Sequence, residues 1–246
     1  MVLVAIALSL LIGLALGLLG GGGSMLTLPI LTYALGVDAK AAIASSLLVV
    51  GVTSLAALVQ PARAGNVEWR TGFVFGAGGV AGAFCGGLLA DRFSPRTLLL
   101  LFAGMMVATS IAMFRGRRLD GDVPESAAPA PKMALIGFLV GGLTGLVGAG
   151  GGFVVVPALA LLGALPMKKA VGTSLLVITM NSFAGYLGHA RHVAIDAPLT
   201  ALVATAAVGG ALLGGAFAAS VRPELLRKGF AGFVLVMALF QIAQEL

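Results

Sequence analysis

The chain has 246 residues, of which 59% are hydrophobic and 10% are charged, against about 45–50% and about 25% in soluble domains. With a mean hydropathy of +1.10, this composition excludes a soluble globular fold, because so few ionisable side chains cannot cover its surface, whereas a bilayer accepts it. The net charge of +6 does not indicate nucleic-acid binding, since the Lys and Arg residues fall in short clusters between apolar segments. The single cysteine, Cys85, excludes an intrachain disulfide.

Ten apolar segments are predicted to be helices. They lie at residues 2–19, 25–35, 41–60, 72–90 and 96–114, and then at 133–147, 153–164, 170–188, 198–218 and 224–244. The polar, proline-rich stretch between these two sets is predicted to be an aqueous linker at residues 115–132. In each set a glycine-rich segment separates the first two helices, at residues 20–24 and 148–152.

The two sets of helices are copies of one unit. Residues 17–114 align with residues 145–242 without a gap, and 28 of the 98 pairs are identical. The identical pairs include the prolines Pro29 and Pro157 and the Ser-Leu-Leu-Val runs that begin at Ser46 and Ser174. The chain is therefore predicted to contain two repeats, residues 1–114 and 133–246.

The opening pair of helices in each repeat either crosses the membrane once, as a broken helix, or turns back as a hairpin. A single crossing puts seven Lys and Arg residues on one side and eight on the other. A hairpin puts eleven on one side and leaves four on the other, namely Lys40, Arg92, Arg96 and Arg191. Only the hairpin produces the asymmetry that the positive-inside rule demands.

The predicted fold is thus an all-α integral membrane protein with two inverted-topology repeats. Each repeat is a glycine-tipped helical hairpin, at residues 2–35 or 133–164, followed by three transmembrane helices. Both termini are predicted outside the cytoplasm, and the linker inside it.

These features resemble the TauE/SafE family of bacterial sulfite exporters. The resemblance rests on the paired Gly-Leu-x-Gly-x-Gly-Gly segments followed by Pro29 and Pro157, on the Ser-Leu-Leu-Val runs and on the later glycine-rich helices. It covers nearly the whole chain outside the linker. It implies a carrier in the bacterial inner membrane for small sulfur-containing anions, such as sulfite or organosulfonates, without a bound cofactor.

Geometry supports anion binding independently of the resemblance. The second arm of each hairpin starts at the glycine-rich tip, so two helix N-termini converge inside the membrane from opposite faces. Such ends attract anions, and glycine lets the backbone approach a ligand closely. Because the first helix is about 27 Å long and nearly spans by itself, the depth of the tips stays open.

The predicted substrate-binding residues are the tips and the polar side chains of the apolar helices. They are Gly20, Gly21, Gly22, Gly23, Ser24, Gly148, Gly150, Gly151, Gly152, Ser45, Ser46, Thr173, Ser174, Asn181 and Ser182, with Thr53 and Ser54 as counterparts of the last two. For each hydroxyl the alternative is a hydrogen bond to a helical carbonyl or to a neighbouring helix. Asn181 is the best candidate, because its amide is costly in lipid unless paired.

Other residues carry weaker predictions. Arg63 and Arg191 occupy matching positions and are candidates for a gate or vestibule, with interfacial anchoring as the alternative. His189 and His192 are predicted to be interfacial rather than metal-binding. The glycines spaced four apart, such as Gly78 and Gly82, are predicted to form a helix-packing seam.

The acidic residues all fall at segment ends or in loops, which disfavours coupling through a membrane-embedded carboxylate. No catalytic motif and no nucleotide-binding motif occurs, so neither an enzyme nor a cofactor is predicted. The predicted function is potential-driven or channel-like export of an anion. The alternatives are a carrier or channel for another small anion or for a neutral or cationic solute, and a non-transporting membrane subunit. The predicted partners are the anion and the lipid bilayer, and homo-oligomerisation stays open.

Overall fold

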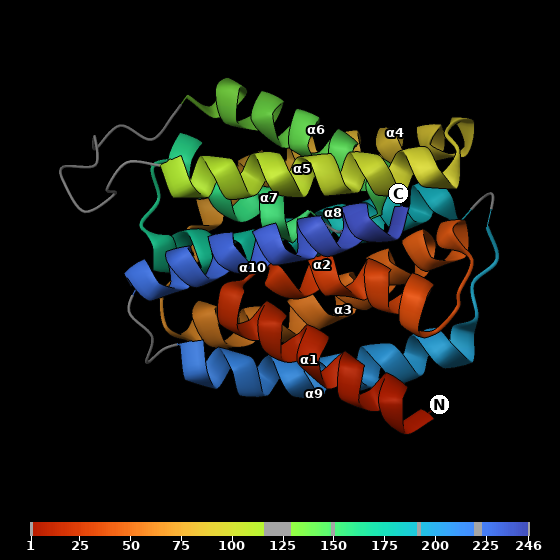
Figure 1. Cartoon of the computed structure of the whole chain (residues 1–246). Coiled ribbons are helices and arrows are strands. Elements are labelled where there is room, and N and C mark those ends of the chain that lie inside the picture. The colour runs from red at the N-terminus through yellow and green to blue at the C-terminus, as the bar shows by residue number, and fades with distance from the viewer. Residues whose placement is uncertain (1, 116–128, 149–150, 191–192, 219–222, 246) are drawn as a thin grey trace.

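The computed structural model describes residues 2–115, 129–148, 151–190, 193–218 and 223–245, and its regular elements there are all helices. Figure 1 shows the long helices side by side in one bundle. In chain order the elements are α1 (Val2–Leu19), α2 (Gly22–Pro29), η1 (Ile30–Ala34), α3 (Ala39–Arg63), α4 (Trp69–Leu89), η2 (Ala90–Arg92), α5 (Pro95–Arg115), α6 (Ala130–Val147), α7 (Gly152–Pro157), η3 (Ala158–Leu162), α8 (Met167–His189), α9 (Ala197–Ala218) and α10 (Pro223–Glu245).

The predicted all-helical membrane class is confirmed. Six helical segments within the described residues are long and apolar enough to cross a bilayer, and they are Ala39–Arg63, Trp69–Arg92, Pro95–Met113, Ala130–Val147, Met167–His189 and Ala197–Phe217. α6 is therefore as long as a span, although the sequence predicted a hairpin arm there. At about 1.5 Å per residue, α1 and α6 each extend about 27 Å.

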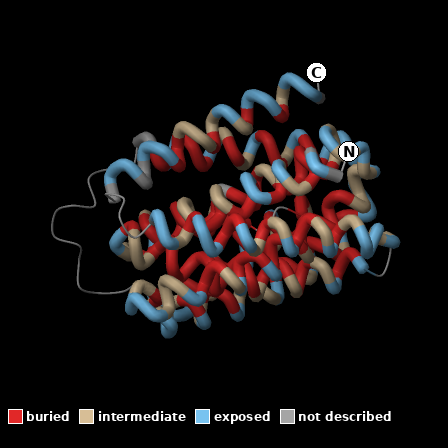
Figure 2. The backbone as a smooth tube through the Cα atoms, turned by 90° about the horizontal axis from the view of Figure 1, so that it is seen from below, coloured by how far each residue is buried: buried red, intermediate tan, exposed pale blue. Residues whose placement is uncertain are grey.

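The outer surface of the bundle is apolar. Figure 2 shows the buried positions gathered inside the bundle and the exposed ones around it. Large hydrophobic side chains stand fully outward on several helices, among them Leu3, Leu139, Phe217 and Leu239. Such a surface is compatible with lipid rather than with water.

Both opening helix pairs turn back on themselves. Gly20 and Gly148 have φ angles of +70° and +76°, a left-handed conformation that ends α1 and α6. In the first pair, α2 then packs against α1, where a Cβ on Gly23 would overlap the carbonyl oxygen of Ile12. The pair therefore forms a hairpin rather than one broken helix.

The second arm of each hairpin is shorter in its α-helical part than predicted. The segments predicted as single helices at 25–35 and 153–164 instead change from α-helix to π-helix directly after Pro29 and Pro157. A proline lacks an N–H and its ring clashes with the carbonyl four residues earlier, which accounts for the change of helix type.

Glycines bring α6 against α4 and α1 against α9. On α4, a Cβ on Gly78, Gly82 or Gly86 would overlap backbone atoms of α6. On α9, a Cβ on Gly210 or Gly214 would overlap backbone atoms of α1. The predicted packing seam is confirmed, and backbones that approach this closely gain dispersion contacts that lipid cannot supply.

The centre of the bundle is formed by α3 and α8, which are the most deeply buried of the long helices. They contact each other where Gly51 of α3 faces Ser182 and Phe183 of α8. Ion pairs tie the ends of these helices to their neighbours. Lys40 of α3 lies 3.0 Å from Asp91 of η2, and Lys169 of α8 lies 3.2 Å from Glu68 before α4.

The substitution Gly82→Ala tests the packing seam. It is expected to destabilise the protein by about 1–3 kcal/mol, because the new methyl forces α4 away from the backbone of α6. Thermal unfolding in detergent measures the effect. Gly104→Ala on α5 is the matched control, since a Cβ there has no neighbour within 4 Å. Equal melting temperatures for the two variants would contradict the seam.

Candidate functional site

The two glycine-rich tips meet inside the bundle. A Cβ on Gly21, which precedes α2, would overlap backbone atoms of Gly152, the first residue of α7. A Cβ on Gly152 would in turn overlap the backbone of Gly21 and come 3.0 Å from Ile178 of α8. The tips therefore touch backbone to backbone beside α8, which only residues without a side chain allow.

Two serine hydroxyls, one from each half of the chain, each form a hydrogen bond with the hairpin of the other half. Ser46 of α3 donates to the carbonyl oxygen of Gly148 in the second hairpin. Ser174 of α8, which aligns with Ser46 in the second half of the sequence, has its Oγ 3.3 Å from the carbonyl oxygen of Gly20 in the first hairpin. Each hydroxyl also lies within 2.8 Å of a carbonyl oxygen of its own helix. The hydroxyls thus satisfy carbonyls that the interrupted helices leave unpaired.

Three more predicted residues also have protein partners. The hydroxyl of Ser24 donates to the carbonyl of Gly21 at 2.7 Å and closes the first tip. Ser45 accepts from Thr200 at 3.3 Å, and Thr173 accepts the backbone N–H of Glu68 at 2.8 Å. These three hydroxyls therefore have hydrogen-bond partners within the protein.

Asn181 and Ser182 are different, because their polar atoms have no partner among the described residues. Both amide atoms of Asn181 and the hydroxyl of Ser182 are buried and unpaired, and the hydroxyl of Ser54 on α3 shares this property. An unpaired buried amide or hydroxyl costs about 1–3 kcal/mol. Such groups are candidates to bind a ligand that the bundle admits.

These unpaired groups lie close to the meeting point of the tips. Ile178, which faces Gly152, is one helical turn before Asn181 and Ser182 on α8. The amide of Asn181 fills the space that the missing side chain of Gly79 leaves on α4. Tips, amide and hydroxyls therefore form one candidate site at the junction of α2, α3, α4, α7 and α8.

The remaining predicted residues are placed as follows. Gly22 starts α2, and Gly23 packs against α1. Gly151 has a φ angle of +79° directly before α7. Gly150, Arg191 and His192 lie outside the described residues. Arg63 is exposed at the end of α3, away from the site.

His189, which the sequence predicts to be interfacial, is buried in the bundle. It ends α8, and its Nε2 lies 2.8 Å from the carbonyl oxygen of Gly145 on α6. The polar contact satisfies the ring inside the bundle, so His189 joins α8 to the end of the first arm of the second hairpin.

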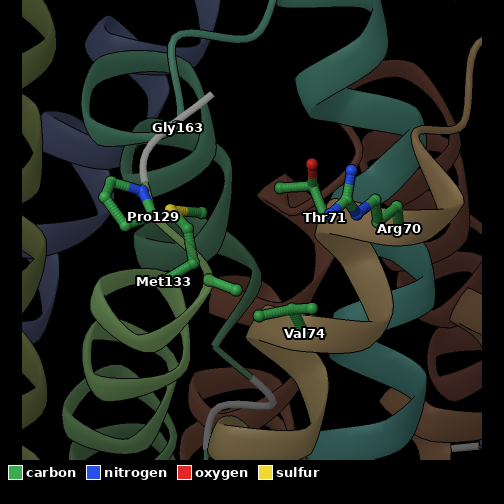
Figure 3. A pocket seen from close by; sticks show the side chains of 7 residues that line it. Arg70, Thr71, Val74, Pro129, Met133 and Gly163 are labelled. Carbon is green, nitrogen blue, oxygen red and sulfur yellow. The ribbon is translucent and has the colours of Figure 1, made fainter. Parts of the chain in front are cut away.

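The prediction from sequence did not find the pocket at Arg70. A cavity of about 210 Å³ lies beside the starts of α4 and α6 and is lined by Arg70, Thr71, Val74, Pro129, Ala130, Met133 and Gly163. Figure 3 shows Arg70, Thr71 and Val74 on one wall and Pro129, Met133 and Gly163 on the other. Arg70 has proline as its counterpart at position 198, so comparison of the repeats draws no attention to it.

Comparison with known proteins identifies relatives along almost the whole chain. The family model described as sulfite exporter TauE/SafE matches residues 5–240. A probable membrane transporter protein of Xylella fastidiosa (strain 9a5c) is 34% identical over 238 residues, which cover 94% of this chain and 91% of that protein. A probable membrane transporter protein of Methanocaldococcus jannaschii is 27% identical over 259 residues, covering 98% of this chain and 96% of that protein.

A third relative is the probable membrane transporter protein YunE of Bacillus subtilis. It is 27% identical over 249 residues, which cover 92% of this chain and 90% of that protein. No solved structure shows a significant match. The predictions of a multi-pass membrane transporter, and of a protein that is not an enzyme, are confirmed by these relatives.

The substitution Ser46→Ala tests the reciprocal binding of the tips. It is expected to lower stability by about 0.6–1.5 kcal/mol, because the carbonyl of Gly148 loses its donor inside the bundle. Unfolding in detergent measures the loss. Ser9→Ala is the matched control, since the hydroxyl of Ser9 is also buried but donates only to Ala5 of its own helix. An equal loss of stability in both variants would show that the hydrogen bond between Ser46 and the second hairpin does not stabilise the protein.

Proposed function

The chain belongs to the sulfite exporter TauE/SafE family, and from this premise we propose that it exports small sulfur-containing anions, such as sulfite or an organosulfonate, across the bacterial inner membrane. The anion binds near the membrane midplane, between the glycine-rich tips. One observation carries the assignment of the site: beside those tips, the amide of Asn181 and the hydroxyls of Ser182 and Ser54 are buried without a hydrogen-bond partner among the described residues.

The chemistry of these groups favours an anion. The amide NH₂ and the two hydroxyls donate hydrogen bonds, which sulfite and sulfonate oxygens accept. The described carboxylates all lie at helix ends. They are Asp38 before α3, Glu68 before α4, Asp91 in η2, Asp196 before α9 and Glu224 in the first turn of α10. The described part of the bundle interior thus offers a cation no carboxylate ligand.

The proposal includes two repeats of opposite orientation, residues 1–114 and 133–246. It is supported by contacts that recur between aligned positions of the two halves. Gly82 faces Phe138 as Gly210 faces Leu10, and Gly148 faces Ile43 as Gly20 faces Val171. In Figure 1, α5 and α10 run in opposite directions, as inverted counterparts do.

The distribution of charge supports the orientation in the membrane. We call the end of the bundle at which α3 ends and α4, α6 and α8 begin the α3–α4 face. Of the described Lys and Arg side chains, this face carries Arg63, Arg70, Lys132, Lys168, Lys169 and Lys228, and the opposite face carries Lys40, Arg92 and Arg96. The α3–α4 face and the linker are therefore cytoplasmic in our proposal, and both termini are outside.

Transport requires the tips to separate, because Gly21 and Gly152 are in backbone contact. The π-helical turns after Pro29 and Pro157 are the interrupted parts of the arms that carry the tips. π-Helical turns of this kind frequently occur at functional sites. Rearrangement of one arm at a time opens the site toward one face and then toward the other.

Export of an anion from a negative interior needs no coupling ion. Each charge gains about 2.3 kcal/mol per 100 mV, which corresponds to a distribution ratio of about 50 for a monovalent anion. In proteoliposomes, we expect sulfite or ethanesulfonate efflux to rise with an interior-negative potassium diffusion potential. Efflux that ignores this potential but requires a proton or sodium gradient would refute uniport. Flux of a cation or neutral solute without anion flux would favour the alternative substrates.

The substitution Asn181→Leu separates ligand binding from a structural role. Because the amide has no partner, its removal is expected to leave the melting temperature unchanged or raised, while anion flux falls by more than about tenfold. Flux and thermal unfolding are measured on the same preparation. The matched control is Thr179→Val, two residues earlier, whose hydroxyl donates at 2.7 Å within its own helix. If Asn181→Leu retains normal anion flux, the amide of Asn181 does not bind the transported anion.

A further inference from the structure

We propose that the pocket at Arg70 is a second anion site, in which the transported anion binds at the α3–α4 face before it reaches the tips. This inference rests on the proposed function and adds a residue and a ligand chemistry to it. The pocket holds about 210 Å³, roughly the space of seven water molecules. It fits a small anion and is too small for a nucleotide or a lipid headgroup with its chains.

The charge in the pocket is that of Arg70. Its guanidinium has no hydrogen bond or ion pair with any described residue, and it lines the cavity together with Thr71. The neighbouring carboxylate, Glu68, forms an ion pair with Lys169 of α8 at 3.2 Å. The guanidinium of an arginine binds sulfonate or carboxylate oxygens in a bidentate way.

The rest of the wall is apolar. Val74 lies one turn after Arg70 on the same helix. Met133 of α6 and Pro129, which directly precedes α6, lie on the opposite wall (Figure 3). A charged end and an apolar wall together suit an anion that carries a short carbon chain, such as a small organosulfonate. Sulfate, which has two charges and no apolar part, fits this wall poorly.

The pocket is connected to the central site along two elements. On α4, Arg70 precedes Gly79, the contact of Asn181, by nine residues, which is about 13 Å along the helix axis. On the other wall, Gly163 directly follows η3, which belongs to the same arm as α7, and α7 begins at the tip residue Gly152. An anion that leaves the pocket inward along α4 and the second hairpin reaches the tips.

The first test is transport in proteoliposomes, with ethanesulfonate supplied from the α3–α4 face. Arg70→Gln is expected to raise the half-saturating concentration about five- to tenfold while the maximal rate changes less than twofold, and Arg70→Lys is expected to restore part of the affinity. Lys132→Gln is the matched control. It removes a charge from the same face at an exposed position of α6 outside the pocket lining.

The second test does not depend on transport. Thr71→Cys is made in a chain whose native Cys85 is replaced by alanine, and its reaction with 2-sulfonatoethyl methanethiosulfonate is compared with that of the 2-trimethylammonioethyl reagent. The anionic reagent is expected to react at least fivefold faster. Adding Arg70→Gln is expected to abolish the preference, whereas adding Lys132→Gln leaves it.

The outcomes separate the two proposals. If wild-type protein moves no sulfur-containing anion but Thr71→Cys keeps its Arg70-dependent preference, the pocket stands and the proposed function fails. If wild-type flux is normal but Arg70→Gln matches Lys132→Gln in both tests, the pocket is not an anion site and the proposed function is untouched.

Discussion

The whole arrangement depends on one constraint: inside a bilayer, every backbone amide and carbonyl must find a partner within the protein. The two hairpin tips break the helical ladder deep in the bundle, where an unpaired polar group costs several kcal/mol. Each tip is supported by a hydroxyl from the other half of the chain, Ser46 for Gly148 and Ser174 for Gly20. Neither proposed repeat can therefore bury its own tip alone, and the two halves stabilise each other.

These hydrogen bonds between the halves are consistent with the way in which the first helix of each half lies against the other half. α1 packs on α9 and α6 packs on α4, through glycines that let the backbones touch. In lipid, hydrophobic burial does not drive helices together, so close packing and polar contacts must do so. The glycine content is thus divided between two tasks, which are the seams between long helices and the tips that meet at Gly21 and Gly152.

Much of the fold could be predicted from the sequence. The composition indicated the membrane, and the uneven distribution of Lys and Arg favoured hairpins over broken spans. The two repeats that the gapless alignment predicts belong to our proposal. The site was harder to predict, because Ser46 and Ser182 are both serines in apolar helices. They differ only in the groups that face them in the folded protein. One faces a tip carbonyl and is satisfied, whereas the other faces Gly51 and is not. The pocket at Arg70 could not be predicted for a related reason. Its opposite wall comes from α6 and from the segment around Gly163, which approach Arg70 only in the folded protein.

The two halves are not equivalent at the centre, and this has a kinetic consequence. Asn181 aligns with Thr53, whose hydroxyl donates to a carbonyl of its own helix. Gly79 leaves space for the amide of Asn181, whereas the residue aligned with Gly79 is Ala207. In the site that we propose, a solute held by the amide of Asn181 therefore lies nearer to one half than to the other. For the proposed uniporter, its two routes out cross barriers of unequal height, so influx and efflux differ in their saturation behaviour.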